Sequence, residues 1–489
     1  VVREAGDADA TFVNRIPTEQ RGDVVAIPLR LQTTREATLR IGDESVGYEA
    51  NVTVRDAGDD RDGRVTVYFD TYAAATYGTG SFSGENDLVT VSEDDRIVDG
   101  EVTVGVSNLL DPEIYPMEAS IDGRVTDVAQ IELRPRETIA VRTWTAPRNR
   151  YSNLDAPADV REASGEWLTR DSEIATGDAV VYEIRASGLD GALDARGEDT
   201  ITAEFFDFAD GSASSPAAQF AVEQRDPGPN RDPLLLQLNG SNSRVIADSE
   251  NDSYYVVSRT GDLGPSGVRD ADGDGVIDTD ESTYAPIGTD DSLRANFTVF
   301  GSDRNDLDLT DGGGDETVSA TYSLTEAQYT MNEPFNVTAA SGQEVFGEAT
   351  VAPGTEVTVR VRSGDGVRPP FLKSGTATVD ADGQFLVTLS FNDTEPGDPY
   401  AVTVTGTGPA SELTVDGTVQ PVIPTATTQT PEETTTVTTT TTATETPTRA
   451  TTATPGTTTT AVPTFQTPTT TPGFGVATAL VALAGAALL

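Results

Sequence analysis

The chain has 489 residues, with eighty Asp and Glu against thirty-two Lys and Arg, so its formal net charge is −48. Cysteine and histidine are both absent, which excludes a disulfide framework, thiol or imidazole catalysis and the usual zinc ligands. The acidity argues against nucleic acid as a partner, because phosphate binding needs a basic surface. The length suggests about three domains.

The cations are almost all arginine, since Lys373 is the only lysine and the other thirty-one are Arg. An acid-rich, lysine-poor composition is typical of proteins that live in near-saturated salt. There the self-repulsion of a dense carboxylate surface is screened within about 3 Å. Hydrophobic residues make up 36% of the chain and occur in patterned runs. We therefore expect a folded, salt-adapted protein rather than a disordered acidic one.

Strand patterns recur along the first 420 residues and are separated by Asp-Gly, Gly-Asp and Asn-Gly turn signals. No long segment has helical apolar spacing, so we predict an all-β fold of tandem, immunoglobulin-like β-sandwiches with little helix. The predicted strands are Asp23–Leu31, Tyr48–Arg55, Arg64–Tyr72, Glu101–Ser107, Ile131–Trp144, Asp178–Ala186, Thr200–Phe208, Tyr254–Arg259, Phe297–Phe300, Glu356–Arg362, Gly375–Asp380, Phe385–Phe391 and Ala401–Thr407.

Composition divides the chain into five parts. We expect an N-terminal β domain at 1–150, a second β domain at 151–320, an immunoglobulin-like sandwich at 321–423, a stalk at 424–472 and a sorting or transmembrane segment at 473–489. The Pro-rich segment Pro147–Ala158 reads as a linker after the first domain. The alternative is two larger units, with the first 320 residues folded together.

The C-terminal parts carry exported-protein signals. In residues 424–472, twenty-seven of forty-nine residues are Thr and seven are Pro, which is typical of an extended, O-glycosylated stalk. Residues 473–489 are apolar and uncharged, but at about sixteen residues they are short for a membrane span, which needs about twenty. They are closer to a hydrophobic segment that is removed when a lipid is attached.

Six Asn-X-Ser/Thr triplets are candidate glycan acceptors, and the exported context favours modification of several of them. Three of them open strand-like runs, so we expect Asn51, Asn296 and Asn336 to be less accessible than Asn239 and Asn251 on turns. The six acceptors are Asn51, Asn239, Asn251, Asn296, Asn336 and Asn392.

The sharpest motif is the segment from Asp270 to Glu281, which matches the twelve-residue calcium loop D-x-D-x-D-G-x-I-D-x-x-E. Its flanks read as loop rather than helix, so the expected role of Ca²⁺ is structural. A solvated Asp-rich loop is the alternative. The predicted ligands are the side chains of Asp270, Asp272, Asp274, Asp278 and Glu281 and the carbonyl of Val276.

Two other acidic clusters, at Asp56–Asp62 and Asp303–Asp315, have no defensible ligand spacing and are expected to be solvated turns, with weak ion binding as the alternative. All carboxylates other than the six in the Asp270–Glu281 loop are expected to face solvent. No residue is assigned a catalytic role.

The stalk, the tripeptide Pro472-Gly473-Phe474 and the Ala/Leu/Val-rich segment together resemble the PGF-type sorting signal of haloarchaeal cell-surface glycoproteins, including S-layer glycoproteins. In that family an archaeosortase removes the hydrophobic segment and a lipid replaces it. The family pattern normally continues into an Arg/Lys cluster, whereas this sequence stops at Leu489. The Val1-Val2 start is what we expect of a mature chain whose signal peptide has been cleaved.

The resemblance implies an exported, glycosylated surface protein of a halophilic archaeon, attached to the membrane at its C-terminus. The expected partners are the membrane, an archaeosortase-type enzyme and other copies or neighbouring surface glycoproteins. A structural S-layer-like role is the first hypothesis, and an adhesin that recognises a glycan or another cell is the alternative. A hydrolase is disfavoured, because no acid–base pair is singled out among eighty carboxylates.

Overall fold

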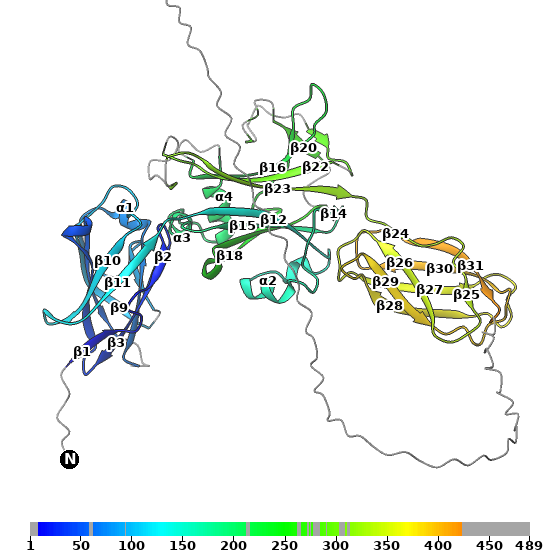
Figure 1. The fold of residues 1–489 in the computed structure, drawn as a ribbon, viewed down its shortest axis with the longest axis horizontal. Helices are drawn as coiled ribbons and strands as arrows, with labels where there is room; N and C mark the ends of the chain where they lie inside the picture. The colour runs from blue at the N-terminus through cyan, green and yellow to red at the C-terminus, as the bar shows by residue number, and fades with distance from the viewer. Residues whose placement is uncertain are drawn as a thin grey trace, which may run out of the picture. The chain divides into compact units, whose positions relative to one another are not determined.

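The computed structural model describes residues 8–422, except residues 58–61, 93, 212–215, 262–265, 271–272, 274, 277–283, 290, 303–308 and 311–312. Residues 1–424 form one compact unit. The described part of this unit consists mainly of strands in six sheets, which pack in pairs to form three sandwiches (Figure 1). The all-β prediction is therefore confirmed. The predicted stalk and hydrophobic segment lie outside the described residues.

The first sandwich pairs a four-stranded sheet, in the order β1-β3-β6-β8, with a seven-stranded sheet, in the order β2-β11-β10-β4-β5-β9-β7. Buried and exposed residues alternate along β3 and β5, as expected when one face of each sheet packs on the core. The strands are β1 (Asp9–Phe12), β2 (Thr18–Gln20), β3 (Val24–Gln32), β4 (Glu36–Asp43), β5 (Tyr48–Arg55), β6 (Arg64–Asp70), β7 (Gly80–Phe82), β8 (Val89–Val91), β9 (Arg96–Val104), β10 (Ile114–Ile121) and β11 (Arg124–Arg134).

The second sandwich pairs a five-stranded sheet, β13-β12-β15-β19-β18, with a seven-stranded sheet, β14-β23-β22-β16-β17-β20-β21. Strand β15 is buried at seven of its eight residues, because its two faces pack against different apolar clusters. The strands are β12 (Thr138–Ala146), β13 (Thr169–Arg170), β14 (Glu173–Ala175), β15 (Ala179–Ala186), β16 (Ala218–Gln224), β17 (Leu234–Leu235), β18 (Ser243–Asp248), β19 (Ser253–Arg259), β20 (Ser266–Arg269), β21 (Tyr284–Pro286), β22 (Ser292–Val299) and β23 (Glu316–Thr325).

The third sandwich pairs a three-stranded sheet, β24-β26-β29, with a five-stranded sheet, β25-β31-β30-β27-β28. Its core is built mainly from valines and aromatic residues that point inward from both sheets. The strands are β24 (Tyr329–Thr330), β25 (Val337–Thr338), β26 (Gln343–Ala349), β27 (Glu356–Ser363), β28 (Leu372–Thr378), β29 (Gln384–Leu389), β30 (Pro399–Gly406) and β31 (Leu413–Gln420).

Helices are few and short, and one of them replaces a predicted strand. The segment expected as strand Thr200–Phe208 is helix α4 (Ile201–Phe208). The Thr200 hydroxyl caps it by accepting the Ala203 N–H, and its buried phenylalanines, Phe205 and Phe208, are three residues apart, which is helical spacing. The others are η1 (Glu44–Val46), α1 (Ala73–Tyr77), η2 (Tyr151–Asn153), α2 (Pro157–Ala163), α3 (Asp190–Asp194) and η3 (Ser249–Asn251).

The first boundary lies earlier than expected. The single predicted strand Ile131–Trp144 is divided, because β11 ends at Arg134 in the first sandwich and β12 pairs with β15 in the second. The expected linker at Pro147–Ala158 holds η2 and the start of α2. Its Leu154 is buried in a small apolar cluster with Trp167, so this segment is part of the second sandwich.

Candidate functional site at the domain junctions

The first junction is centred on Asp23, which lies in the turn between β2 and β3. Its two carboxylate oxygens accept the backbone N–H groups of Gly188, at 2.8 Å, and Asp190, at 3.2 Å, in the loop after β15. The Gly191 N–H donates to the Gly22 carbonyl at 3.0 Å. These bonds connect the first sandwich to the second: all three donors are main-chain N–H groups, and two of the three acceptor atoms belong to the Asp23 carboxylate.

Two glycines make this approach possible. Gly22 has φ +96° and Gly188 has φ +71°, in the left-handed region that favours glycine. A Cβ on Gly22 would lie 2.3 Å from the Gly188 carbonyl oxygen, and a Cβ on Gly188 would lie 2.3 Å from that of Arg21. The backbones of the two domains are therefore too close for any side chain at either position.

Several carboxylates gather around Asp23. Burial raises the pKa of Asp23 well above its usual range, and the nearby charge of Asp190 raises it further. Burial also raises the pKa of Glu19 to about 6, with Asp252 and Asp190 adding to the effect. Asp190 in turn accepts the Tyr254 hydroxyl at 2.6 Å. The junction thus concentrates negative charge where water is excluded.

Asp70 belongs to the same cluster and sits at the end of β6. Its Oδ1 caps α1 by accepting the N–H groups of Tyr72 and Ala73, at 2.8 and 3.0 Å. Burial raises the pKa of Asp70 to about 7, although these two hydrogen bonds oppose the shift. Tyr72 packs into the core of the second sandwich, so Asp70 orients a side chain that crosses the junction.

The second junction uses the same device with a different charge environment. Asp178, which is completely buried, accepts the Arg148 N–H at 3.1 Å and the Ala352 N–H of the third sandwich at 2.7 Å. Burial raises the pKa of Asp178 to about 6, while its two hydrogen bonds and the charge of Arg148 lower it. The expectation that all carboxylates outside the calcium loop face solvent is therefore wrong for Asp23, Asp70 and Asp178. Each of them satisfies main-chain donors that would otherwise be buried unpaired.

The junction carboxylates are not arranged as a metal site. Within the residues that the structure describes, no group of three or more acidic side chains is arranged to hold a metal ion. Sequence reasoning missed the junctions because Arg21-Gly22-Asp23 and Gly188-Leu189-Asp190 look like ordinary surface turns. The closely spaced Gly and Asp residues were the available signal, but nothing local shows that another domain covers them.

The predicted calcium loop is described only in part. Asp270 is buried, and its Oδ1 and Oδ2 accept the N–H groups of Gly273 and Gly275, at 2.6 and 3.0 Å. Gly275 has φ +79°, the left-handed conformation that a glycine turn supplies. The first half of the loop thus folds around the carboxylate of its first residue, Asp270. Asp272, Asp274, Asp278 and Glu281 lie outside the described residues.

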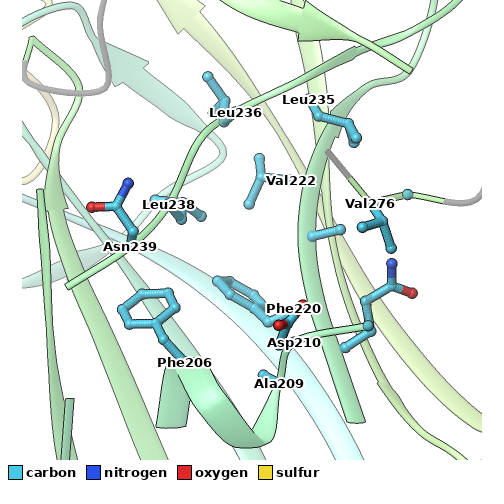
Figure 2. Close-up of a pocket in the computed structure, with 14 residues that line it drawn as sticks. Phe206, Ala209, Asp210, Phe220, Val222, Leu235, Leu236, Leu238, Asn239 and Val276 are labelled. Carbon is cyan, nitrogen blue, oxygen red and sulfur yellow. The ribbon is translucent and has the colours of Figure 1, made fainter. Parts of the chain in front are cut away.

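A pocket of about 270 Å³ lies beside this loop in the second sandwich (Figure 2). Its apolar wall comes from α4, β16 and the segment after β17, with the half-buried rings of Phe206 and Phe220 among its lining residues. Val276, the predicted carbonyl ligand, also lines it, and exposed Asn239 stands at the opposite side in Figure 2.

The sequons differ in exposure. Asn239, Asn251, Asn336 and Asn392 are exposed, whereas Asn51 and Asn296 are half-buried within β5 and β22. Asn296 also donates to Glu223 at 2.9 Å. The expected low accessibility therefore does not hold for Asn336. It precedes the two-residue strand β25 rather than lying inside it, and its Oδ1 accepts the Thr418 N–H.

The structure describes only part of each of the two other acidic clusters. Asp56 is buried rather than solvated: its Oδ2 accepts the Gly63 N–H, and its Oδ1 has no hydrogen-bond partner among the residues that the structure describes. Asp315 accepts the Gly301 N–H at 3.1 Å. The sorting residues Pro472, Gly473 and Phe474 lie outside the described range. No helix within that range is long and apolar enough to cross a membrane.

Comparison with known proteins found relatives of similar sequence. Over its whole length the chain is 38% identical to the "Cell surface glycoprotein" of Haloferax gibbonsii, of which it covers 54%. The chain is therefore similar in sequence to a haloarchaeal cell surface glycoprotein. Two such glycoproteins of Haloarcula hispanica, numbered 2 and 1, are 29% and 28% identical over 82% of the chain and 44% of their own length. The chain thus spans about half the length of these curated relatives.

Residues 2–122, nearly all of the first sandwich, match a family described as a domain of unknown function, DUF7827. A solved structure of a titin fragment matches 85% of the chain, and the match includes 98% of that fragment. The sequence identity is 9% and the TM-score is 0.17. Such a score is too low to carry an argument. The relation to haloarchaeal cell surface glycoproteins therefore stands on sequence similarity, and the sandwich architecture stands on the structure itself.

Proposed function

We propose that the chain is a structural, S-layer-like cell-surface glycoprotein of a halophilic archaeon. The observation that carries this proposal is the 38% identity to a cell surface glycoprotein along the whole chain. The two buried junctions support it, because a coat subunit must hold its domains in fixed register. The hydrogen bonds from Gly188 to Asp23 and from Ala352 to Asp178 are buried, so molar salt screens them little. The proposal assigns the chain no catalytic activity.

Calcium and the C-terminus complete the proposal. Asp270, Asp272, Asp274, Asp278 and Glu281, with the carbonyl of Val276, would hold one structural Ca²⁺. The buried carboxylate of Asp270 at the loop's first position fits that role. The PGF tripeptide Pro472-Gly473-Phe474 would direct an archaeosortase-type enzyme to replace the hydrophobic segment with a lipid. The stalk would carry O-linked glycans, and the exposed sequons N-linked ones.

Cryo-tomography of native envelopes tests the structural role. The proposal expects a periodic array that disappears when the gene is deleted and weakens when calcium is chelated. Sparse, unordered copies would contradict it. Calorimetry on the purified protein tests the calcium loop: binding heat is expected for the wild type and not for Asp270→Ala or Glu281→Ala.

A second candidate function is an adhesin or receptor that recognises a glycan. The open pocket with Phe206 and Phe220 favours it, because aromatic rings pack well against sugar faces. Cell-to-cell contact that is lost in a Phe206→Ala variant, with the array intact, would support this role.

A further inference from the structure

Asn239 differs from the other sequon asparagines in how its side chain is held. Its Oδ1 accepts the Ser241 N–H at 2.9 Å and also accepts the Ser241 hydroxyl. The side chain is exposed, and its Nδ2 donates no hydrogen bond to any residue that the structure describes. The sequon serine thus holds the oxygen of the amide and leaves the nitrogen, the atom that a glycan is joined to, available.

The other five sequons, all within the described residues, use their polar groups differently. In three of them the asparagine nitrogen donates to a carboxylate. These pairs are Asn51 with Glu49, Asn251 with Asp248, and Asn296 with Glu223. The Asn336 Oδ1 accepts the Thr418 N–H. In the Asn392 sequon, the Thr394 hydroxyl is buried and donates to the Phe391 carbonyl at 2.7 Å. Among the six, only the Asn239 sequon bonds its own hydroxyl to its own amide oxygen.

The turn that carries Asn239 is fixed by further hydrogen bonds. The Asn239 carbonyl accepts the N–H groups of Asn242 and Ser243, at 3.1 and 2.9 Å. The Asn242 Oδ1 in turn accepts the Asn239 N–H at 3.0 Å. A sugar attached at this position would therefore start from a well-defined point, which lowers the entropy cost of placing it against the protein.

This turn lies against helix α4. A Cβ on Gly240 would lie 3.7 Å from the Thr202 methyl group, and the Thr202 hydroxyl accepts the Val245 N–H at 3.0 Å. Thr202 and Phe206 are four residues apart in α4, so they share one face of the helix. The face that meets the turn is therefore the face that carries the half-buried ring of Phe206.

Phe206 and Asn239 both line the pocket of about 270 Å³, in which Figure 2 shows Asn239 at one side. Leu238, which is half-buried, and the buried Val222 and Leu236 continue the apolar wall. An open apolar hollow is a liability in concentrated salt, because salting-out conditions strengthen association through apolar surface. The acceptor nitrogen thus lies at the rim of a surface that is better covered.

We propose that Asn239 carries an N-linked glycan whose first sugars fold over this pocket and pack on Phe206 and Leu238. The inference rests on the proposed glycoprotein function, and it adds which sequon is modified and where its glycan lies. The glycan is the occupant because its point of attachment is itself a residue of the rim. A sugar ring has an apolar C–H face that packs on an aromatic ring, while its hydroxyl groups remain hydrated.

The attachment is a simple substitution at a sugar carbon. A bond forms between the Asn239 Nδ2 and the anomeric carbon, and the bond from that carbon to the phosphate of a lipid-phosphate-linked sugar donor breaks. The phosphate leaves with the bonding electron pair, and Nδ2 loses one proton. Nothing is oxidised or reduced, and the amide stays uncharged.

Glycopeptide mass spectrometry and hydroxyl-radical footprinting test the proposal on the full chain, purified in molar salt from a halophilic archaeal host. The Asn239 peptide is expected to carry a sugar mass. Phe206 should be oxidised several-fold more slowly in the wild type than in Asn239→Gln, because the glycan covers its ring. Phe346 of the third sandwich, which is 48% exposed, should be oxidised equally in both. The melting temperature of Asn239→Gln should be lower by about 2 to 4 °C, as expected for one lost packing contact.

Three further variants are matched controls. Ser241→Ala removes the sequon hydroxyl and should behave like Asn239→Gln, whereas Ser241→Thr keeps it and should behave like the wild type. Asn251→Gln removes another exposed sequon of the same sandwich and should leave Phe206 oxidation unchanged. All three positions are exposed, so circular dichroism should show an intact fold in every variant.

The contrary outcomes separate this inference from the proposed function. A bare Asn239 in a chain whose other sequons carry glycan would overturn the inference and leave the glycoprotein function standing. A chain with no modified asparagine would refute the N-linked glycans of that function as well. A modified Asn239 with equal Phe206 oxidation in wild type and Asn239→Gln, or an equal effect of Asn251→Gln, would overturn the packing on the pocket. A bare Asn239 with Phe206 protected by added methyl α-glucoside would assign the pocket to an external sugar.

Discussion

The two domain junctions show the same device in opposite electrostatic surroundings. At each, one buried aspartate accepts two backbone N–H groups, at least one of them from the neighbouring sandwich. Asp23 lies among other carboxylates, whereas the charge of Arg148 lowers the pKa of Asp178. The comparison shows that the main-chain donors determine where a carboxylate is needed. Neighbouring side chains determine how much the charge of that carboxylate lowers the free energy of unfolding.

The largest expected effect comes from filling the glycine contacts. Gly188→Ala should lower the free energy of unfolding by about 3 kcal/mol, because the left-handed backbone disfavours a side chain and the new Cβ meets main chain. Gly354→Ala at the second junction, with φ +84°, would meet the Trp167 Cβ at 2.5 Å and should cost a similar amount. Denaturant unfolding in molar salt measures both.

The control is Gly123→Ala. Gly123 has φ +77° but no atom within 4 Å of an added Cβ, so the substitution should cost only about 1 kcal/mol. Equal costs at all three positions would show that the junctions tolerate a side chain and that their close approach is unimportant.

Truncating the two aspartates should distinguish the junctions. Asp178→Ala leaves the buried N–H of Ala352 and the part-buried N–H of Arg148 unpaired and should cost about 3 kcal/mol. Asp23→Ala likewise leaves the buried N–H of Gly188 and the part-buried N–H of Asp190 unpaired, but it also removes repulsion from Asp190, so we expect about 2 kcal/mol. Asn at either position keeps one acceptor and should cost less than Ala. A greater loss for Asp23→Ala than for Asp178→Ala would reverse the comparison.

The pH dependence follows from the raised pKa values. The folded protein binds protons more tightly than the unfolded chain at Asp178, with a pKa of about 6, and at Asp70, with a pKa of about 7. The unfolding free energy from these groups therefore falls as pH rises from about 4 through those values, and is flat above them. The slope approaches about 1.4 kcal/mol per pH unit for each titrating group.

Unfolding at a series of pH values in constant salt measures this slope. Asp178→Asn should remove the part that ends near pH 6, and Asp70→Asn the part that ends near pH 7. A wild-type stability that rises between pH 4 and 7 would contradict the raised pKa of both groups.

The smallest expected effect concerns the cation at the second junction. Arg148→Ala keeps the backbone N–H that Asp178 accepts but removes a charge that lowers its pKa. The pKa of Asp178 should rise by about half a unit, as expected for one partly screened charge. Carboxyl titration followed by ¹³C NMR measures it, and the titration of Asp70 should not move.

Local patterns were sufficient for most of the fold. Strand patterns located β5, β15 and β27 nearly to the residue, because β5 and β27 alternate between a core face and an outer face and β15 is rich in β-branched and aromatic residues. The pattern failed at α4, where eight residues contain both Phe-rich strand character and helical spacing, and packing in the second core decides for the helix. It also joined β11 to β12, since both have strand patterns and only the fold assigns them to different sandwiches.

The sequence by itself determined the composition class, the strand-rich architecture and the aspartate spacing of the Asp270–Glu281 loop, because each depends on residues that are near one another in the chain. Only the tertiary structure decided which carboxylates are buried. Asp23 meets Gly188 across 165 positions and Asp178 meets Ala352 across 174. Whether an aspartate costs or contributes stability depends on the donors and charges that the fold brings to it, and those lie in another domain.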